Sequence, residues 1–179
     1  MQFTLPINTG SASGRSVVWK WTNPIAASSI AAISGWGGGT ANTYGGVIGQ
    51  PDVPRCLRYT FSNTWTGGNV TVTGTFDGAA ALYTITSSPG SNNVDIPAAL
   101  FTTVTSITKT VVGAGTFSLG YGDTLGIASG GSNVDQFGIG VANGSSTTTT
   151  GTARVDGRAV TFGLSPNGGR TFVYTANKA

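Results

Sequence analysis

Residues 69–76 read NVTVTGTF, and this stretch decides the fold class. Side chains alternate between two faces along an extended chain, so Val70, Val72 and Phe76 share one face and threonines occupy the other. Threonine suits a strand because it is β-branched, and it keeps the outer face polar without any charge. The pattern therefore predicts a half-buried strand, and the Asp77-Gly78 pair after it predicts a hairpin turn.

Similar alternating runs recur along the chain, and each ends at a cluster of Gly, Pro, Asn or Asp. Predicted strands cover residues 15–22, 55–62, 69–76, 80–86, 100–111, 115–120, 134–142, 152–163 and 170–176. Many short strands with closely spaced turns favour two packed sheets over a fold that alternates strands with helices. We therefore expect an all-β fold, a jelly-roll-like β-sandwich.

One segment favours a helix instead. Asn23-Pro24 provides a cap and a proline suited to the first helical position, and an alanine-rich run then ends at Gly35. One or two helical turns are therefore predicted near residues 24–34.

The stretch that follows, residues 35–49, is uncharged and rich in glycine. It is predicted to form a long loop or extended arm that carries Trp36 and Tyr44, because loops of this length are commonly functional or lie on a partner. The expected organisation is an N-terminal strand with this extended arm or loop over residues 1–50, followed by the β-sandwich domain over residues 51–179.

The composition of the 179 residues removes most of the usual enzyme chemistry. There is no His, no Glu and one Cys, and only 8% of the residues are charged, against about 25% in ordinary soluble domains. Ser-His and Cys-His nucleophile pairs, an imidazole base and a His-bearing zinc site are thereby excluded. The composition favours a protein that packs against other protein.

The only acidic groups are six Asp side chains, most of them beside Gly or Pro in predicted turns, where Asp commonly bonds its own backbone. A glycan hydrolase needs two carboxylates, but no spacing nominates a pair of Asp residues for that role. GYGDTLG at residues 120–126 is similar to half of a glycine-rich calcium turn, without the repeated array that accompanies such turns. No catalytic residue, no cofactor and no metal ligand is therefore expected.

The formal net charge of +3 reflects few acids rather than many cations. Lysines and arginines are scattered, and only Arg55 with Arg58 and Arg154 with Arg158 lie close together, so no stripe suited to a phosphate backbone is present. The uncharged stretch 21–50 is interrupted by glycines and does not read as a membrane span. Neither nucleic acid nor a membrane is an expected partner, and the first residues show no secretion signal.

Cysteine and tryptophan give more specific expectations. Cys56 lies in an alternating run and is expected to be a small buried residue rather than a reactive thiol. Trp19 and Trp21 share a strand face and are expected in the core. Trp36 and Trp65 lie beside glycine or threonine in predicted loops, where an exposed indole would anchor a partner surface or stack on a sugar ring.

The stretch from Arg55 to Ile127 resembles small virion-associated proteins of tailed bacteriophages. The similarity is carried by RYTF at 58–61, VTVTGTFDG at 70–78, LFTTVTSI at 100–107 and LGYGDTLGI at 119–127, with shorter matches at 25–34 and 165–175. One departure concerns an acid that the relatives place just before the strand after the hairpin, since Tyr83-Thr-Ile85 has none here. If that acid pairs with the upstream basic residue in the relatives, Arg58 must find another partner.

The resemblance implies a noncatalytic structural component of a phage particle. Such components include trimeric cement or decoration proteins of the head with jelly-roll folds. By this resemblance we expect a homotrimer on the capsid surface of the virion, made in the host cytoplasm and bound to the major capsid protein. Trimerisation would strengthen many weak contacts through avidity. The expected partner contacts are Trp36, Tyr44, Trp65, Arg55 and Arg58.

Two further expectations concern the N-terminal region and the alternatives. Deletion of residues 1–50 is expected to weaken particle binding more than folding. The sequence also leaves open a carbohydrate-binding receptor-recognition module, with Trp65 or Trp36 as the stacking platform. A tail or neck accessory component of the virion is a third possibility that the sequence does not separate from a head protein.

Overall fold

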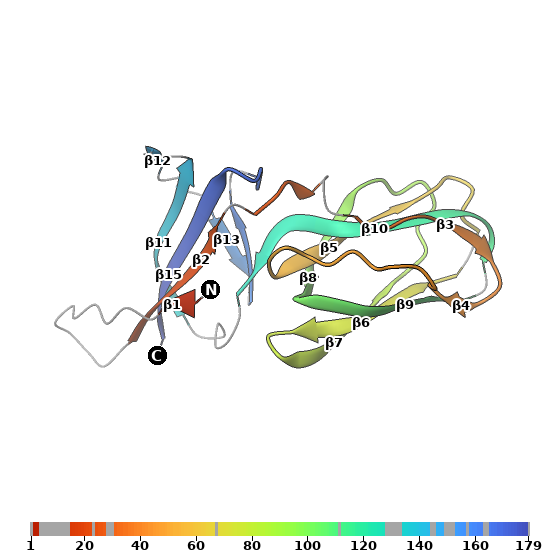
Figure 1. Cartoon of the computed structure of the whole chain (residues 1–179), viewed down its shortest axis with the longest axis horizontal. Coiled ribbons are helices and arrows are strands. Elements are labelled where there is room, and N and C mark those ends of the chain that lie inside the picture. Colours follow the sequence, from red (N-terminus) through yellow and green to blue (C-terminus); the bar gives the residue numbers. More distant parts are fainter. Residues whose placement is uncertain are drawn as a thin grey trace.

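The computed structural model describes residues 2–3, 15–22, 24–27, 31–66, 68–110, 112–127, 134–143, 146–148, 153–156, 158–162 and 165–178. The regular elements of this part are β-strands in three antiparallel sheets (Figure 1). Two of the sheets face each other as a sandwich, and the third lies beside them. The predicted all-β sandwich class is confirmed.

The first sheet of the sandwich is built around one long strand. Its order is β13 (Ala153–Asp156), β14 (Ala159–Phe162), β10 (Val112–Gly126), β5 (Arg55–Phe61) and β8 (Val94–Phe101), and β3 (Ala31–Gly39) also pairs with β10. β3 and β14 lie one after the other along the same edge of β10, and β5 lies along its other edge.

The second sheet has the order β4 (Asn42–Thr43), β9 (Thr103–Lys109), β6 (Val70–Phe76) and β7 (Ala79–Ile85). Burial alternates along β6 as the sequence predicts, with Val70, Val72 and Phe76 buried and the threonines between them partly exposed. The core between the two sheets contains an aromatic cluster of Phe61, Trp65 and Phe117, whose ring centroids lie 4.9–6.0 Å apart.

The third sheet has the order β1 (Gln2–Phe3), β2 (Arg15–Thr22), β15 (Arg170–Lys178), β11 (Val134–Asn143) and β12 (Ser146–Thr148). It meets the first sheet through aromatic contacts, since Phe162 of β14 packs against Trp21 (5.9 Å) and Phe172 (4.8 Å). Trp21 is buried, as predicted, whereas the side chain of Trp19 lies outside the described part.

Most predicted strands are confirmed, and the differences have local causes. The predicted strand 100–111 is divided at Thr102 between β8 and β9, and the predicted strand 152–163 is the hairpin of β13 and β14. β3 and the first part of β8, residues 94–99, were not predicted, because β3 is rich in glycine, which has no side chain to alternate, and β8 contains Pro97.

The helix predicted near residues 24–34 is wrong over Ala31–Ser34, which begin β3; residues 28–30 lie outside the described residues. Ala32 and Ile33 are buried in the sandwich core, and β3 gains a hydrogen-bonding partner in β10. Pairing with β10 provides hydrogen bonds for the backbone N–H and C=O groups of β3. A helix of one or two turns would instead bear the full free-energy cost of helix nucleation.

The glycine-rich stretch 35–49 is extended, as expected, but it lies along its own sandwich. Its first part is β3, and β4 then pairs with β9, so residues 31–43 belong to both sheets of the sandwich. Gly38 makes this possible, because a Cβ there would meet backbone atoms of Ala114 on β10 at 3.0 Å.

Candidate functional site

Trp65 was predicted as an exposed partner contact, and the structure corrects this. The residue lies in a loop, as expected, but its side chain is only 1% exposed. The indole packs against Phe61 and Phe117, and its ring N–H donates to the carbonyl oxygen of Gly68 (3.3 Å). The ring closes this end of the core, so it offers no surface to a partner or a sugar.

Arg55, a second predicted contact, is also buried, at 0% exposure. Its guanidinium donates two hydrogen bonds to the carboxylate of Asp52 (2.7 and 3.0 Å) and one to the carbonyl oxygen of Ile25 (2.6 Å). Asp52 also accepts the backbone N–H of Ile25 (2.8 Å). Arg55 therefore ties the segment before β3 to the start of β5, which is a structural role.

The acid that would pair with Arg58 in the relatives is absent from this sequence, and Arg58 pairs with other acids instead. It donates two hydrogen bonds to Asp95 of β8 (2.5 and 3.0 Å) and lies 3.6 Å from a carboxylate oxygen of Asp123 of β10. The hydrogen bond to Asp95 is the main reason that the pKa of the guanidinium is raised above its usual value. Arg58 is thus held by its own chain on the outer side of the first sheet.

The prediction that most Asp residues lie in turns is confirmed for Asp77 and wrong for Asp95 and Asp123, whereas Asp135 and Asp156 lie within strands predicted from the sequence. Asp77 has a positive φ of 54° in the β6–β7 turn. Asp95, Asp123, Asp135 and Asp156 lie in strands. For Asp95 the reason is visible, because its carboxylate bonds an arginine rather than its own backbone.

Cys56 is fully buried, which confirms the expectation of a small core residue. Burial is the main reason that the pKa of its thiol is raised to about 11. The thiol is therefore protonated at neutral pH and shielded from reagents.

Trp36 and Tyr44 are half-buried and contact each other edge to face, with ring centroids 5.6 Å apart. Lys109 of β9 places its ammonium group 4.7 Å from the centroid of the Trp36 ring and donates to the carbonyl oxygens of Gly37 and Gly38. Burial lowers the pKa of Lys109 below its usual value. These two aromatic residues therefore fasten the glycine-rich stretch to its own sandwich.

Residues 42–50 form what we call the edge cap, because they cover the outer edge of β9. β4 pairs with the end of β9, and the backbone N–H of Tyr44 donates to the carbonyl oxygen of Ile107 (2.8 Å). Further along, the side-chain amide of Gln50 donates to the carbonyl oxygen of Val104 and accepts its N–H, both at 2.9 Å. The side-chain amide of Gln50 thus makes the two hydrogen bonds with Val104 that the backbone of a neighbouring strand would otherwise make.

The other edge of this sheet is open. Within the described residues no strand lies beside β7 on its outer side, and β7 pairs with β6 without any register shift. The chain carries no charged residue from Gly78 to Val94, and Leu82 on β7 is 68% exposed. Edge strands of soluble proteins are normally protected by lysine, proline or a bulge, none of which β7 has.

β8, which faces β7 across the opening of the sandwich, does have such protection. The β5–β8 register shifts between Cys56 paired with Leu100 and Leu57 paired with Ile96, so residues 97–99, which include Pro97, form a bulge. A bulge and a proline both hinder the addition of another strand. Of the two strands at this opening, β7 is therefore the one that can accept a strand.

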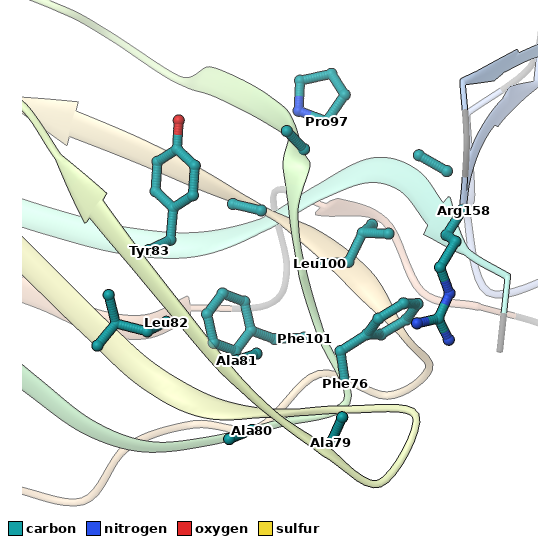
Figure 2. Close-up of a pocket in the computed structure, with 13 residues that line it drawn as sticks. Phe76, Ala79, Ala80, Ala81, Leu82, Tyr83, Pro97, Leu100, Phe101 and Arg158 are labelled. Carbon is teal, nitrogen blue, oxygen red and sulfur yellow. The ribbon is translucent and has the colours of Figure 1, made fainter. Parts of the chain in front are cut away.

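A groove of about 450 Å³ lies between these two strands (Figure 2). We call it the alanine groove, because its walls are residues 79–83 of β7 and 97–101 of β8, seven of which are alanine or leucine. Phe76 and Arg158 close one end, where the guanidinium lies 4.4 Å from the centroid of the Phe76 ring and forms an ion pair with Asp77.

A second hollow, of about 490 Å³, continues beyond Tyr83, which lines both. We call it the tyrosine groove; its lining consists of Tyr59 of β5, residues 83–88, and Val94 and Ile96 of β8. In Figure 2 the ring of Tyr83 rises from β7 with its hydroxyl group at the end away from the strand.

The sequence analysis did not nominate either groove. Tyr83 was noted only for the acid missing beside it, and Tyr59 only as part of a motif. The long uncharged run from Gly78 to Val94 was a usable signal, because an edge strand without charge is unusual in a protein that has no partner.

Comparisons of the chain with protein-family models, with curated proteins and with solved structures find no match. Within the described residues there is no helix long and apolar enough to cross a membrane. The same residues contain no group of three or more His, Cys, Asp or Glu side chains that could hold a metal ion.

Proposed function

We propose that this chain is a structural protein of a bacteriophage virion, a capsid cement or decoration protein that binds the major capsid lattice as a homotrimer. The observation that carries the proposal is the open, uncharged edge of β7 beside the alanine groove. The sequence resemblance to virion-associated proteins supplies the identity of the partner.

The physical argument rests on how a sheet edge binds protein. An extended segment of a neighbouring subunit can pair with β7 through main-chain hydrogen bonds and insert alternate side chains into a groove. The alanine groove is largely apolar, and its one charged side chain, Arg158, is already paired with Asp77. Association there desolvates no unpaired ion, which is the costly step at many interfaces.

We also infer that the sandwich is a jelly roll. The supporting observation is the pair of strand orders β3-β10-β5-β8 and β4-β9-β6-β7. Between β3 and β10 the chain crosses from one sheet to the other at every connection except the β6–β7 hairpin. Two interleaved Greek keys of four strands each have this alternation.

The proposed contact surface differs from the one expected from sequence. Trp65 and Arg55 are buried, and Arg58 is held in ion pairs. Trp36 and Tyr44 remain partly exposed but pack against the core. The proposed contact is instead Leu82 with the rest of the β7 edge.

The test is electron microscopy of particles that lack this protein, after incubation with the full chain. The proposal expects density for trimers at fixed positions on the head. Leu82→Lys places a charge on the edge strand and is expected to reduce the bound copies by about tenfold or more. Val47→Lys adds the same charge to the edge cap, at a residue 92% exposed, and should leave binding unchanged.

Two results would overturn the proposal. Density confined to the tail or neck would replace the head assignment with an accessory role there. Full binding by Leu82→Lys together with loss of binding by Val47→Lys would move the contact from β7 to the edge cap.

A further inference from the structure

The tyrosine groove differs chemically from the alanine groove that it adjoins. Tyr59 and Tyr83 supply two aromatic rings, and Thr86, Ser87 and Ser88 supply hydroxyl groups along one side. Ile85, Val94 and Ile96 supply apolar surface. A volume of about 490 Å³ falls within the range of roughly 300–1,000 Å³ that small-molecule sites occupy.

The two tyrosine rings are fixed in place before any ligand arrives. Both are half-buried and pack against the sandwich core. Tyr59 contacts Phe61 edge to face at 5.4 Å and pairs with Val94 in the β5–β8 register. Tyr83 pairs with Val72 across the regular β6–β7 ladder. Rings held in this way lose little conformational entropy on binding.

Both tyrosines also keep a polar group for a ligand. Within the described part of the chain neither hydroxyl group has a hydrogen-bonding partner. A tyrosine hydroxyl can donate one hydrogen bond and accept others. The groove therefore combines flat apolar surface with hydroxyl groups at its rim.

No charged side chain lines the groove, all of whose lining residues belong to the described part of the chain. The nearest acid along β8 is Asp95, between Val94 and Ile96, and strand alternation turns it to the opposite face, where it bonds Arg58. A charged ligand would lose its hydration here without gaining a counter-ion. The groove is suited to a neutral ligand.

The side of the groove formed by residues 84–88 is also held by hydrogen bonds. The Thr84 hydroxyl contacts that of Thr71 on β6 (3.1 Å), and the backbone N–H of Ser87 donates to Asn69 (3.2 Å). Ser91 donates to the hydroxyl of Ser88 (2.6 Å). The segment that carries Ser87 and Ser88 is thus held in place beside the groove.

We propose that the tyrosine groove binds a neutral saccharide. A pyranose ring has an apolar face that stacks on an aromatic ring and a rim of hydroxyl groups that bond tyrosine, serine and threonine. This inference does not rest on the proposed attachment to a capsid, although Tyr83 lines both grooves. It also replaces Trp65 and Trp36 as the sugar platform considered from the sequence.

The test measures binding of free sugars to the full chain by saturation-transfer-difference NMR and by titration calorimetry. The probes are glucose, galactose, N-acetylglucosamine and mannose, with glucuronate as the charged counterpart of glucose. At least one neutral sugar is expected to bind, and glucuronate should bind more weakly than glucose.

Tyr83→Ala removes a ring and is expected to weaken binding by about tenfold or more, whereas Tyr83→Phe removes only a hydroxyl group and should weaken it by about threefold. Leu82→Ala is the matched control, because Leu82 is the neighbouring residue on the same strand and does not line this groove. Circular dichroism of each variant verifies that it is folded, and Tyr83→Phe keeps the ring that packs on the core.

Absence of binding by every neutral probe would overturn the proposal, as would equal binding by the chain and Tyr83→Ala. Stronger binding of glucuronate than of glucose would also overturn it. Loss of binding in Leu82→Ala but not in Tyr83→Ala would show that the occupant lies in the alanine groove, as an extended peptide would. Particle attachment is measured separately with Leu82→Lys, so the two proposals can fail independently.

Discussion

Of the two edges of the sheet β4-β9-β6-β7, one is covered by residues 42–50, and the other is left uncovered by the described residues. On the β9 edge, residues 42–50 satisfy the backbone with a two-residue strand, the N–H of Tyr44 and the side-chain amide of Gln50. On the β7 edge, the described part of the chain provides no cover, although the strand is regular and uncharged. The proposed attachment of a partner to β7 rests on this contrast between a bare edge and a covered one.

The comparison of the two edges also changes the role expected for the glycine-rich stretch 35–49. A sequence without charge or side-chain periodicity was expected to reach a neighbouring subunit, but glycine allows β3 to approach β10 closely, and Lys109 then fastens it. The uncharged surface available to a partner lies instead on β7, in a stretch that reads as an ordinary strand.

The largest effect is expected from deletion of residues 1–50, because this deletion removes the residues that cover the β9 edge. The deletion takes away β2, β3 and the edge cap, and with them the buried residues Ala32 and Ile33. We expect loss of cooperative folding rather than a folded protein that binds particles poorly, which reverses the expectation from sequence. Near-ultraviolet circular dichroism and thermal unfolding measure this, and a folded, soluble truncation would contradict it.

A smaller loss is expected when Lys109 is replaced by methionine, which keeps the stem of the side chain but removes the ammonium group. The hydrogen bonds to Gly37 and Gly38 and the contact with Trp36 are lost. The free energy of unfolding should fall by about 2–3 kcal/mol, and Tm by roughly 5–10 °C. Lys20→Met, at an exposed position, is the control and should change the free energy by less than about 0.5 kcal/mol. Equal Tm values for the two variants would show that Lys109 does not fasten β3.

The smallest changes in the free energy of unfolding are expected from one substitution on each edge of the sheet. Gln50→Leu leaves the N–H and C=O of Val104 without their partners and should cost about 1–2 kcal/mol, with faster hydrogen exchange at the Val104 amide. Leu82→Lys on the open edge should change the free energy of unfolding by less than about 0.5 kcal/mol. If Leu82→Lys is the more destabilising of the two, the β7 edge is already covered within the free protein.

Much of the sandwich could be predicted from the sequence, because strands such as β6 carry clear alternation between buried and partly exposed positions. β8 could not, since Pro97 and a bulge interrupt its pattern. The burial of Trp65 depends on the loop folding back over Phe61 and Phe117, which no local pattern reports. The tyrosine groove brings together Tyr59 and Tyr83 through the opposition of β5, β7 and β8, and that juxtaposition exists only in the folded chain.

The position of Arg158 has a structural consequence. The residue immediately precedes β14 and reaches the β6–β7 turn, where it pairs with Asp77 and covers Phe76 at the end of the alanine groove. β14 also carries Phe162, which packs against Trp21 of the third sheet. One short hairpin therefore contacts both the third sheet and the end of the alanine groove.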